Sequence, residues 1–264
     1  MTTRSTILAL LLASGSSGWA ASPLDGEGTW IDLTHDLSSE SVFWPTAKPF
    51  ELTVDAEGMT EQGYYYSAYS FCTAEHGGTH IDAPVHFAER GTTVNEIPLS
   101  RLIGSAVVVD VSSESRADRD YRITVADLTR WEATHGPIPQ GAIVLLRTGY
   151  DRFWPDAEQY LGTAERGSSG AANLHFPGLH ADAAAWLVER RIASVGIDTA
   201  SIDPGQSARF ESHVTLMQAD IPAFENLTNL EDLPPTGVFV VALPVKIRGG
   251  SGGPLRIVAW LPGR

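Results

Sequence analysis

A stretch of eleven residues, 76–86, concentrates side chains that could carry out metal chemistry. It holds three of the eight histidines of the chain, His76, His80 and His86, and the carboxylate of Asp82 lies among them. Imidazole nitrogens and carboxylate oxygens are the ligands that zinc, manganese and iron take in proteins. Two histidines and one carboxylate leave coordination positions open for water or substrate. We therefore predict a catalytic metal site at His76, His80 and Asp82.

The remaining candidate residues allow more than one interpretation. His86 could be a fourth ligand or a free proton carrier, because an imidazole with an ordinary pKa of about 6.5 suits acid–base work at neutral pH. His213 and Glu225, with Glu211 nearby, form a second acidic and imidazole group. Residues so far apart in sequence are usually unrelated, so their spacing alone is a weak indication of a shared site.

The backbone of the stretch 76–86 is predicted to be extended rather than helical. Gly77, Gly78 and Pro84 each disfavour a helix, and β-branched residues lie between them. In extended backbone, residues an even number apart point to the same side. The three histidines and the aspartate satisfy this parity, so we expect them to face one site.

Short strands with a few helices must position these side chains. Apolar or β-branched runs predict strands over 29–34, 63–71, 105–111, 142–147, 192–197, 238–243 and 257–261. Periodic patterns predict helices over 125–133 and 181–191 and a short one over 214–217. We expect a loop at 163–172 and a glycine-rich turn at 248–254. No repeat or long linker divides the chain, so we predict one strand-rich α/β domain.

Composition limits the possible partners. The net charge is −14, which disfavours nucleic acid and anionic membrane surfaces, since both attract clustered lysine and arginine. A hydrophobic content of 43% is enough for a large core. The single cysteine, Cys72, cannot form an internal disulfide, and its place in an apolar strand predicts a packing role. A small-molecule partner is the remaining expectation.

The N-terminus has the pattern of an export signal. Arg4 supplies the positive charge, residues 7–13 form a short apolar run, and Gly18 and Ala20 are the small residues that precede cleavage. The run is too short to span a membrane. We expect residues 1–20 to be a signal peptide and residues 21–264 to form the mature protein, in the periplasm or secreted.

The stretch 76–86 resembles the signature of the metal-dependent cyclase hydrolases, a family that includes bacterial kynurenine formamidase and isatin hydrolase. The segment 32–35 with Trp44-Pro45 resembles the family's opening segment, and 243–256 resembles its closing one. The segments 210–213 and 225–227 resemble the part that completes the metal site. The resemblance spans nearly all of the mature chain.

The resemblance implies a role for each candidate ligand. His76, His80 and Asp82 match the ligands of a first metal, and Asp82 would bridge to a second metal held by His213 and Glu225. The metals would be zinc or manganese, one or two per subunit. The implied fold is a swivelling β/β/α domain, usually in homodimers with pockets near the interface.

The resemblance also implies the reaction. His86 matches the catalytic histidine, so it would move the proton from the attacking water to the leaving nitrogen, while Trp44 and Phe87 could stack on an aryl ring. The expected activity is hydrolysis of aryl formamides or cyclic amides, as in the conversion of N-formylkynurenine to kynurenine and formate in tryptophan catabolism. The alternatives are an isatin or lactone hydrolase and, in another class, a periplasmic metal- or ligand-binding protein without turnover. Export leaves the substrate open, because kynurenine formamidase acts in the cytoplasm.

Overall fold

The computed structural model of the protein describes residues 27–263. The predicted signal peptide at 1–20 therefore lies outside the described residues. Across residues 27–263, the helices are all too short or too polar to cross a bilayer.

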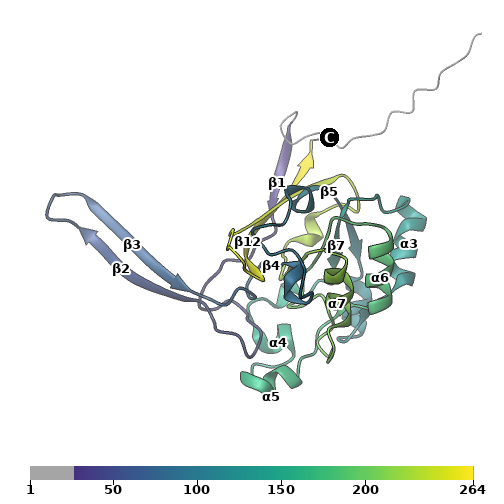
Figure 1. Cartoon of the computed structure of the whole chain (residues 1–264), viewed down its shortest axis with the longest axis horizontal. Helices are drawn as coiled ribbons and strands as arrows, with labels where there is room; N and C mark the ends of the chain where they lie inside the picture. Colours follow the sequence, from purple (N-terminus) through teal and green to yellow (C-terminus); the bar gives the residue numbers. More distant parts are fainter. Residues whose placement is uncertain (1–26, 264) are drawn as a thin grey trace, which may run out of the picture.

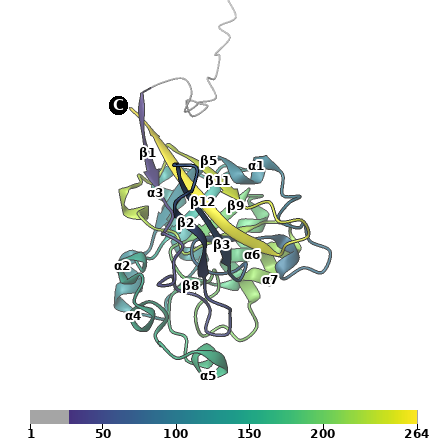
Figure 2. The ribbon, with the colours of Figure 1, turned by 90° about the vertical axis from the view of Figure 1, so that its left-hand side faces the viewer.

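Seven strands close into a barrel at the centre of the molecule (Figure 1). Their order is β12-β11-β5-β7-β9-β10-β4, and β4 pairs back with β12 to complete the ring, while β1 adds to the outer edge of β12. Figure 2 shows β12 as a long strand that crosses the barrel. The strands are β1 (Gly28–Asp32), β4 (His80–Asp82), β5 (Ile103–Asp110), β7 (Ile143–Arg147), β9 (Ser194–Ile197), β10 (Ala223–Glu225), β11 (Val238–Pro244) and β12 (Gly252–Pro262).

Two apolar layers lie on the two faces of this sheet. Along β5, Ala106 and Val108 face the barrel interior, whereas Val107 and Val109 face the covering helices. This alternation follows from the period of two in a strand. Burying one valine side chain of this kind stabilises the folded state by about 1.5–3 kcal/mol, so both faces of the sheet favour closure of the barrel. The predicted strand-rich, single-domain α/β architecture is confirmed.

Three helices, α3 (Val125–His135), α6 (Ala181–Glu189) and α7 (Glu211–Gln218), pack on the outer face of the sheet (Figure 1). The predicted start of α3 is confirmed, because Thr124 and Asp127 form a capping box that satisfies free amides of the first turn. The smaller elements are α1 (Leu99–Leu102), α2 (Ser112–Ala117), α4 (Ala157–Leu161), α5 (Gly167–Ala172), β6 (Arg122–Ile123), β8 (Gly178–Leu179) and the 3-10 turns η1 (Pro84–His86), η2 (Asp151–Phe153) and η3 (Leu230–Asp232).

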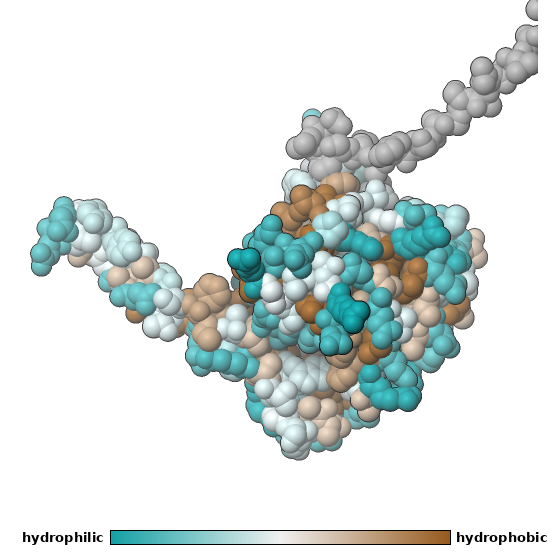
Figure 3. Space-filling view, viewed as in Figure 1, coloured by the Kyte–Doolittle hydropathy of each residue, from teal (hydrophilic) through white to brown (hydrophobic). Residues whose placement is uncertain are grey.

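A hairpin of β2 (Glu51–Met59) and β3 (Tyr65–Cys72) stands away from the body, and we call residues 51–72 the arm (Figures 1 and 3). Near the root of the arm, Leu52 pairs with Phe71 and Val54 with Tyr69, and all four are exposed. The neighbouring cross-strand pair, which points to the opposite face, is the polar Thr53 and Ser70. The arm is thus a two-faced ribbon whose apolar face is uncovered.

Three local predictions outside the histidine stretch were wrong. The segment 167–172 is helical rather than a loop, because contacts with the loop before the arm hold it: Gly167 N–H donates to Pro45 O at 2.9 Å. The expected turn at 248–254 already becomes strand at Gly252, which pairs with Asp82. Cys72 does not pack in a core but is exposed at the root of the arm, since within residues 27–263 β3 forms a sheet with β2 alone.

Candidate metal centre

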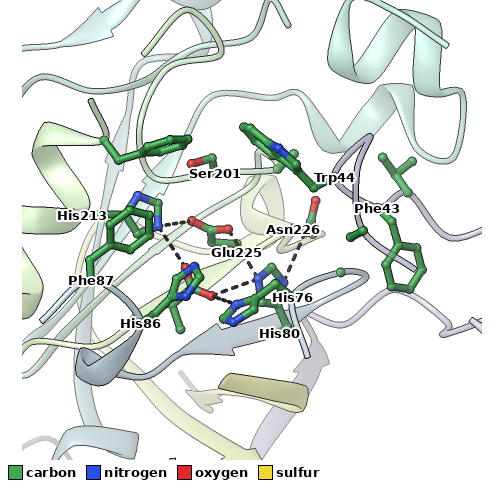
Figure 4. Close-up of a pocket in the computed structure, with 16 residues that line it drawn as sticks. Phe43, Trp44, His76, His80, His86, Phe87, Ser201, His213, Glu225 and Asn226 are labelled. Atoms are coloured by element: carbon green, nitrogen blue, oxygen red, sulfur yellow. Dashed lines mark hydrogen bonds and ion pairs between the residues drawn. The ribbon is translucent and has the colours of Figure 1, made fainter. Parts of the chain in front are cut away.

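The predicted ligands arrive from three neighbouring elements and one loop (Figure 4). Strand β4 carries His80 and Asp82, whose even spacing puts both on one face as predicted. Glu225, at the end of β10, pairs directly with His80 across the sheet. His213 reaches the same place from α7, and His76 from the loop before β4.

The two glycines after His76 are required by close packing and by backbone conformation. A side chain at Gly77 would collide with the ring of Phe43, because its Cβ would lie 2.0 Å from that ring. Gly78 has φ of +60°, a left-handed conformation that glycine adopts without penalty. Together they turn the chain so that His76 folds back toward β4.

The prediction of extended backbone fails after Asp82. Pro84 to His86 form the 3-10 turn η1, in which the His86 N–H donates to Ala83 O at 2.8 Å. Proline is well tolerated at the first position of a helical turn, and this overrides the preference read from the sequence. The turn brings the ring of His86 onto that of His76, with centroids 3.8 Å apart and planes 17° from parallel.

Asp82 lies between the two groups of ligands. Its Oδ1 is 2.6 Å from His76 Nδ1 and 3.1 Å from His80 Nε2, while its Oδ2 is 2.9 Å from His213 Nε2. Glu225 also spans the groups, with Oε1 3.2 Å from His213 Nε2 and Oε2 3.5 Å from His80 Nε2. Within each trio, His76, His80 and Asp82 or Asp82, His213 and Glu225, the donor atoms lie within 4.8 Å of one another.

The electrostatics of this cluster suit a bound cation. Burial opposes a charge on His80, yet the carboxylates of Asp82 and Glu225 raise its pKa to about 9. Burial likewise opposes a charge on His213, but hydrogen bonds to Asp203 and Asp82 raise its pKa well above the ordinary value. These three carboxylates thus stabilise protons on buried imidazoles, at positions where a bound divalent metal would supply the positive charge instead. The nitrogen and oxygen donor set fits zinc or manganese.

Groups behind the ligands fix their orientation. Asp203 Oδ2 is 2.7 Å from His213 Nδ1, and both Asp203 oxygens accept backbone N–H groups at the start of α7. Ser251 Oγ lies 2.9 Å from His76 Nε2. Such partners select the tautomer of a metal-binding histidine. Asp203 was not predicted as a site residue, because Asp203-Pro204-Gly205 has the pattern of a turn. Its position after a parallel strand was the one available signal.

His86 belongs to neither trio among the described residues, and it lines a cavity of about 260 Å³ that opens over both trios. Burial lowers the pKa of His86 to about 4, partly offset by the charge of Asp82. The imidazole is therefore neutral at pH 7, the state that accepts a proton. His86 thus lies beside the candidate ligands, within the cavity, and its ring faces the space over both trios.

Aromatic side chains form the walls of this cavity (Figure 4). Trp44 and Phe87, the two predicted substrate contacts, both line it. Phe43, beside Trp44, and Phe210 also line it, and Phe210 was not predicted. Phe210 lies far from the histidine stretch in sequence, and its ring centroid is 5.3 Å from that of Phe87. An aromatic residue in a loop gives no sequence signal that separates a cavity wall from a core contact.

Glu211, the acidic residue near His213 in the sequence, lies outside the centre, as do two further histidines. Glu211 forms an exposed ion pair with Arg209 at 2.7 Å. His175 pairs with Asp120 at the surface, and His135 ends α3. The structure therefore brings together the five predicted ligands and leaves these residues out.

The model of the family described as "Putative cyclase" matches residues 31–204, which include the whole histidine stretch. An isatin hydrolase of Roseibium aggregatum is 31% identical, over 94% of this chain and 98% of that protein. A kynurenine formamidase of Salinibacter ruber is 28% identical, over 86% and 95% respectively.

The fold agrees with a solved relative as well. The structure of isatin hydrolase A from Ralstonia solanacearum superposes with a TM-score of 0.80 at 34% identity, covering 89% of this chain and 92% of that one. This likeness confirms the expected swivelling β/β/α fold.

Proposed function

The chain belongs to the cyclase family, and from this premise we propose that it opens the ring amide of isatin-like cyclic aryl amides. Its relatives named isatin hydrolase and kynurenine formamidase are hydrolases that act on amide carbon–nitrogen bonds. The products would be an aromatic amine and a carboxylate on one molecule, because the broken bond lies within a ring.

The residues that line the cavity are the reason for proposing isatin rather than N-formylkynurenine as the substrate. Among the described residues that surround it, there is no lysine or arginine. N-formylkynurenine has an amino-acid carboxylate, which proteins usually bind with a guanidinium or ammonium group. Isatin is a neutral, flat bicycle that needs only apolar walls, such as Trp44 and Phe87. Aryl formamides are the second candidate, supported by the formamidase relatives, and lactones the third.

The side chains divide the work of hydrolysis between them. Trp44 and Phe87 hold the aryl ring and exclude water from its faces. His86 accepts a proton from the attacking water and returns it to the ring nitrogen as the carbon–nitrogen bond breaks. His76, His80 and Asp82 would hold one divalent metal, zinc or manganese, and Asp82, His213 and Glu225 would hold a second. A cation in such a site acts as a Lewis acid toward water and carbonyl groups.

A substrate comparison tests the activity. The full chain, loaded with zinc or manganese, is assayed by absorbance against isatin, N-formylkynurenine and a simple lactone. The value of kcat/KM for isatin is expected to exceed that for N-formylkynurenine by about tenfold or more, since the charged group finds no partner. A preference for N-formylkynurenine would contradict the proposed substrate. Absence of turnover on all three would contradict the proposed reaction.

We also propose that two copies of the chain form a dimer through the arm. A two-stranded hairpin by itself is barely stable in water, and an exposed apolar ribbon marks an interaction site. The apolar face at the arm root, Leu52 with Phe71 and Val54 with Tyr69, needs a cover. The body exposes the apolar side chains of Trp30, Leu243 and Val245, and the arm of a second copy would cover one or more of them.

Light scattering after size exclusion tests the dimer. The wild-type chain is expected to elute with twice the mass of one mature chain. Changing the cross-strand pair to lysines, L52K with F71K, should give a monomer, because it charges the apolar face. The matched control is T53K, on the polar face of the same ribbon, which should remain dimeric. A dimeric double variant would overturn the proposal.

We also propose that the protein is exported after cleavage of a signal peptide, because residues 4–20 have the pattern of an export signal. N-terminal sequencing of protein recovered from the periplasm or medium should begin near Ala21. Protein that retains Met1 would contradict export.

A further inference from the structure

We propose that Asn226 is a positioning residue that sets the metal affinity of the site by holding His80 and Glu225 in register. The proposal rests on the proposed function, because it assumes that the two trios bind metal. Asn226 follows Glu225 directly, is buried, and lies at the edge of the cavity. Its role is to orient ligands rather than to bind the metal itself.

The side chain of Asn226 joins α4 to the backbone beneath His80. Its Nδ2 donates to Gly78 O at 2.8 Å, and its Oδ1 accepts from the Tyr160 hydroxyl at 3.0 Å. His80 Nδ1 lies 2.9 Å from the same Gly78 oxygen. If His80 donates from Nδ1 to this carbonyl, its Nε2 is left bare and faces Asp82. The amide of Asn226 holds that carbonyl in place.

The Tyr160 hydroxyl is suited to serve as a permanent donor. Burial raises the pKa of Tyr160 well above its ordinary value, so the phenol keeps its proton. The same hydroxyl also has Asp198 O as an acceptor at 3.1 Å, just after β9, so its one proton is shared between Asp198 O and Asn226 Oδ1. The amide of Asn226 is therefore held at both ends, by a donor on one side and an acceptor on the other.

The backbone of Asn226 supports the second ligand. Asn226 has φ of 55°, in the left-handed region, where asparagine is tolerated better than most residues. Its N–H donates to Thr199 O at 2.9 Å, and its carbonyl accepts from Thr79 Oγ1 at 2.6 Å. These bonds tie the end of β10, and hence Glu225, to the segment that follows β9 on one side and to the segment before His80 on the other.

Every polar group of Asn226 thus connects a ligand-bearing segment to its neighbour. Groups behind metal ligands typically alter affinity by 10–100-fold when they are removed. Asn229 provides a matched comparison, because it is also left-handed, with φ of 56°, and its Nδ2 donates to Asp32 O at 2.8 Å. That contact does not reach any ligand.

The experiment compares N226G, N229G and Y160F in the full chain. Glycine adopts the left-handed conformation freely, so each glycine variant removes only the side-chain bonds. Zinc affinity is measured by competition with a chelator, and the visible spectrum of the cobalt-loaded protein reports ligand geometry. Thermal unfolding of the metal-free proteins measures any general loss of stability.

Zinc binding by N226G is expected to weaken by about 10–100-fold with an altered cobalt spectrum, while N229G stays near wild type. Y160F should also weaken zinc binding. The double variant N226G/Y160F should bind zinc no more weakly than N226G, since both changes act through one connection. If N226G does not fold, Y160F alone still tests the proposal. Unchanged affinity in both variants, or equal weakening in N229G, would overturn the proposal. Wild-type protein that binds zinc but turns over no substrate would contradict the proposed function alone.

Discussion

At the scale of the residue, the stacked pair His76 and His86 shows how neighbouring imidazoles acquire different tasks. His76 points Nδ1 at Asp82 and is oriented by Ser251 on its other nitrogen. His86 lies over it in the cavity, and burial lowers its pKa to about 4. His76 is thus held by a carboxylate, while the ring of His86 is neutral at pH 7, and the proposed mechanism assigns the proton transfer to His86.

Substitution of His86 should therefore separate proton transfer from metal binding. H86A is expected to retain the metal content of wild type and to lose kcat/KM by a factor of about 10²–10⁴, the usual contribution of a positioned acid–base group. Metal analysis and steady-state kinetics on the same preparation check this. The control is H175A, at a surface histidine, which should match wild type. Loss of metal from H86A would make His86 a ligand.

Asp82 is expected to behave in the opposite way. Its two oxygens face different trios, so D82A should release metal from both, with a loss of affinity greater than the about 10–100-fold that removing a group behind the ligands causes. E225A removes a carboxylate from the trio with His213 and should affect mainly that site. Elemental analysis after dialysis distinguishes the two variants. Full metal occupancy in D82A would refute the ligand assignment.

At the scale of the element, the carboxyl end of β9 holds a second unusual carboxylate. Asp198 accepts the N–H groups of Thr148 and Gly149 at 2.8 and 2.7 Å, and the Thr148 hydroxyl at 2.6 Å. Burial, with the nearby charge of Asp151, raises its pKa from 3.8 to about 7. The folded protein therefore keeps a proton that the unfolded chain releases.

This difference gives a defined pH dependence of stability. A raised pKa contributes stability that is complete below 3.8 and is lost as the pH rises through about 7. D198N cannot ionise, so its free energy of unfolding relative to wild type should rise by roughly 2–3 kcal/mol between about pH 5 and pH 8. Urea unfolding at both pH values measures it, with the exposed D232N as control. A constant difference would contradict the prediction.

The elements differ in how well the sequence predicts them. The barrel strands with continuous apolar runs, such as β5 and β7, are predictable because both of their faces are buried. The start of α3 is predictable because Thr124 and Asp127 cap it locally. The helix α5 is not, since contacts with the loop before the arm hold it rather than its own residues.

The same division applies to the site. His76, His80 and Asp82 lie within seven residues, so their type and spacing could be read directly. His213 and Glu225 needed the family resemblance, because only the pairing of β10 with β4 brings Glu225 beside His80. Asp203 and Asn226 act through contacts between loops, and no local pattern records such contacts.

At the scale of the whole molecule, the metal centre lies where β4 joins β10, close to the point of barrel closure. Removing the metal should therefore lower the melting temperature of the entire domain. A metal present at a hundred times its Kd raises the free energy of unfolding by about 2.7 kcal/mol. For a domain of this size, this corresponds to a rise in the melting temperature of roughly 5–10 °C. Calorimetry with and without a chelator measures the difference. In D82A the chelator should have no effect, and an equal shift there would point to a metal bound elsewhere.

The exposed Cys72 makes the arm open to direct observation. Since the chain has one cysteine, a thiol-reactive dye or spin label would attach at a single place, the root of β3. In an assembly of two labelled copies, energy transfer or electron-spin coupling between the labels would then report how the two arms lie. The arm is thus the part of the protein where a distance between two copies could be measured with a single label on each.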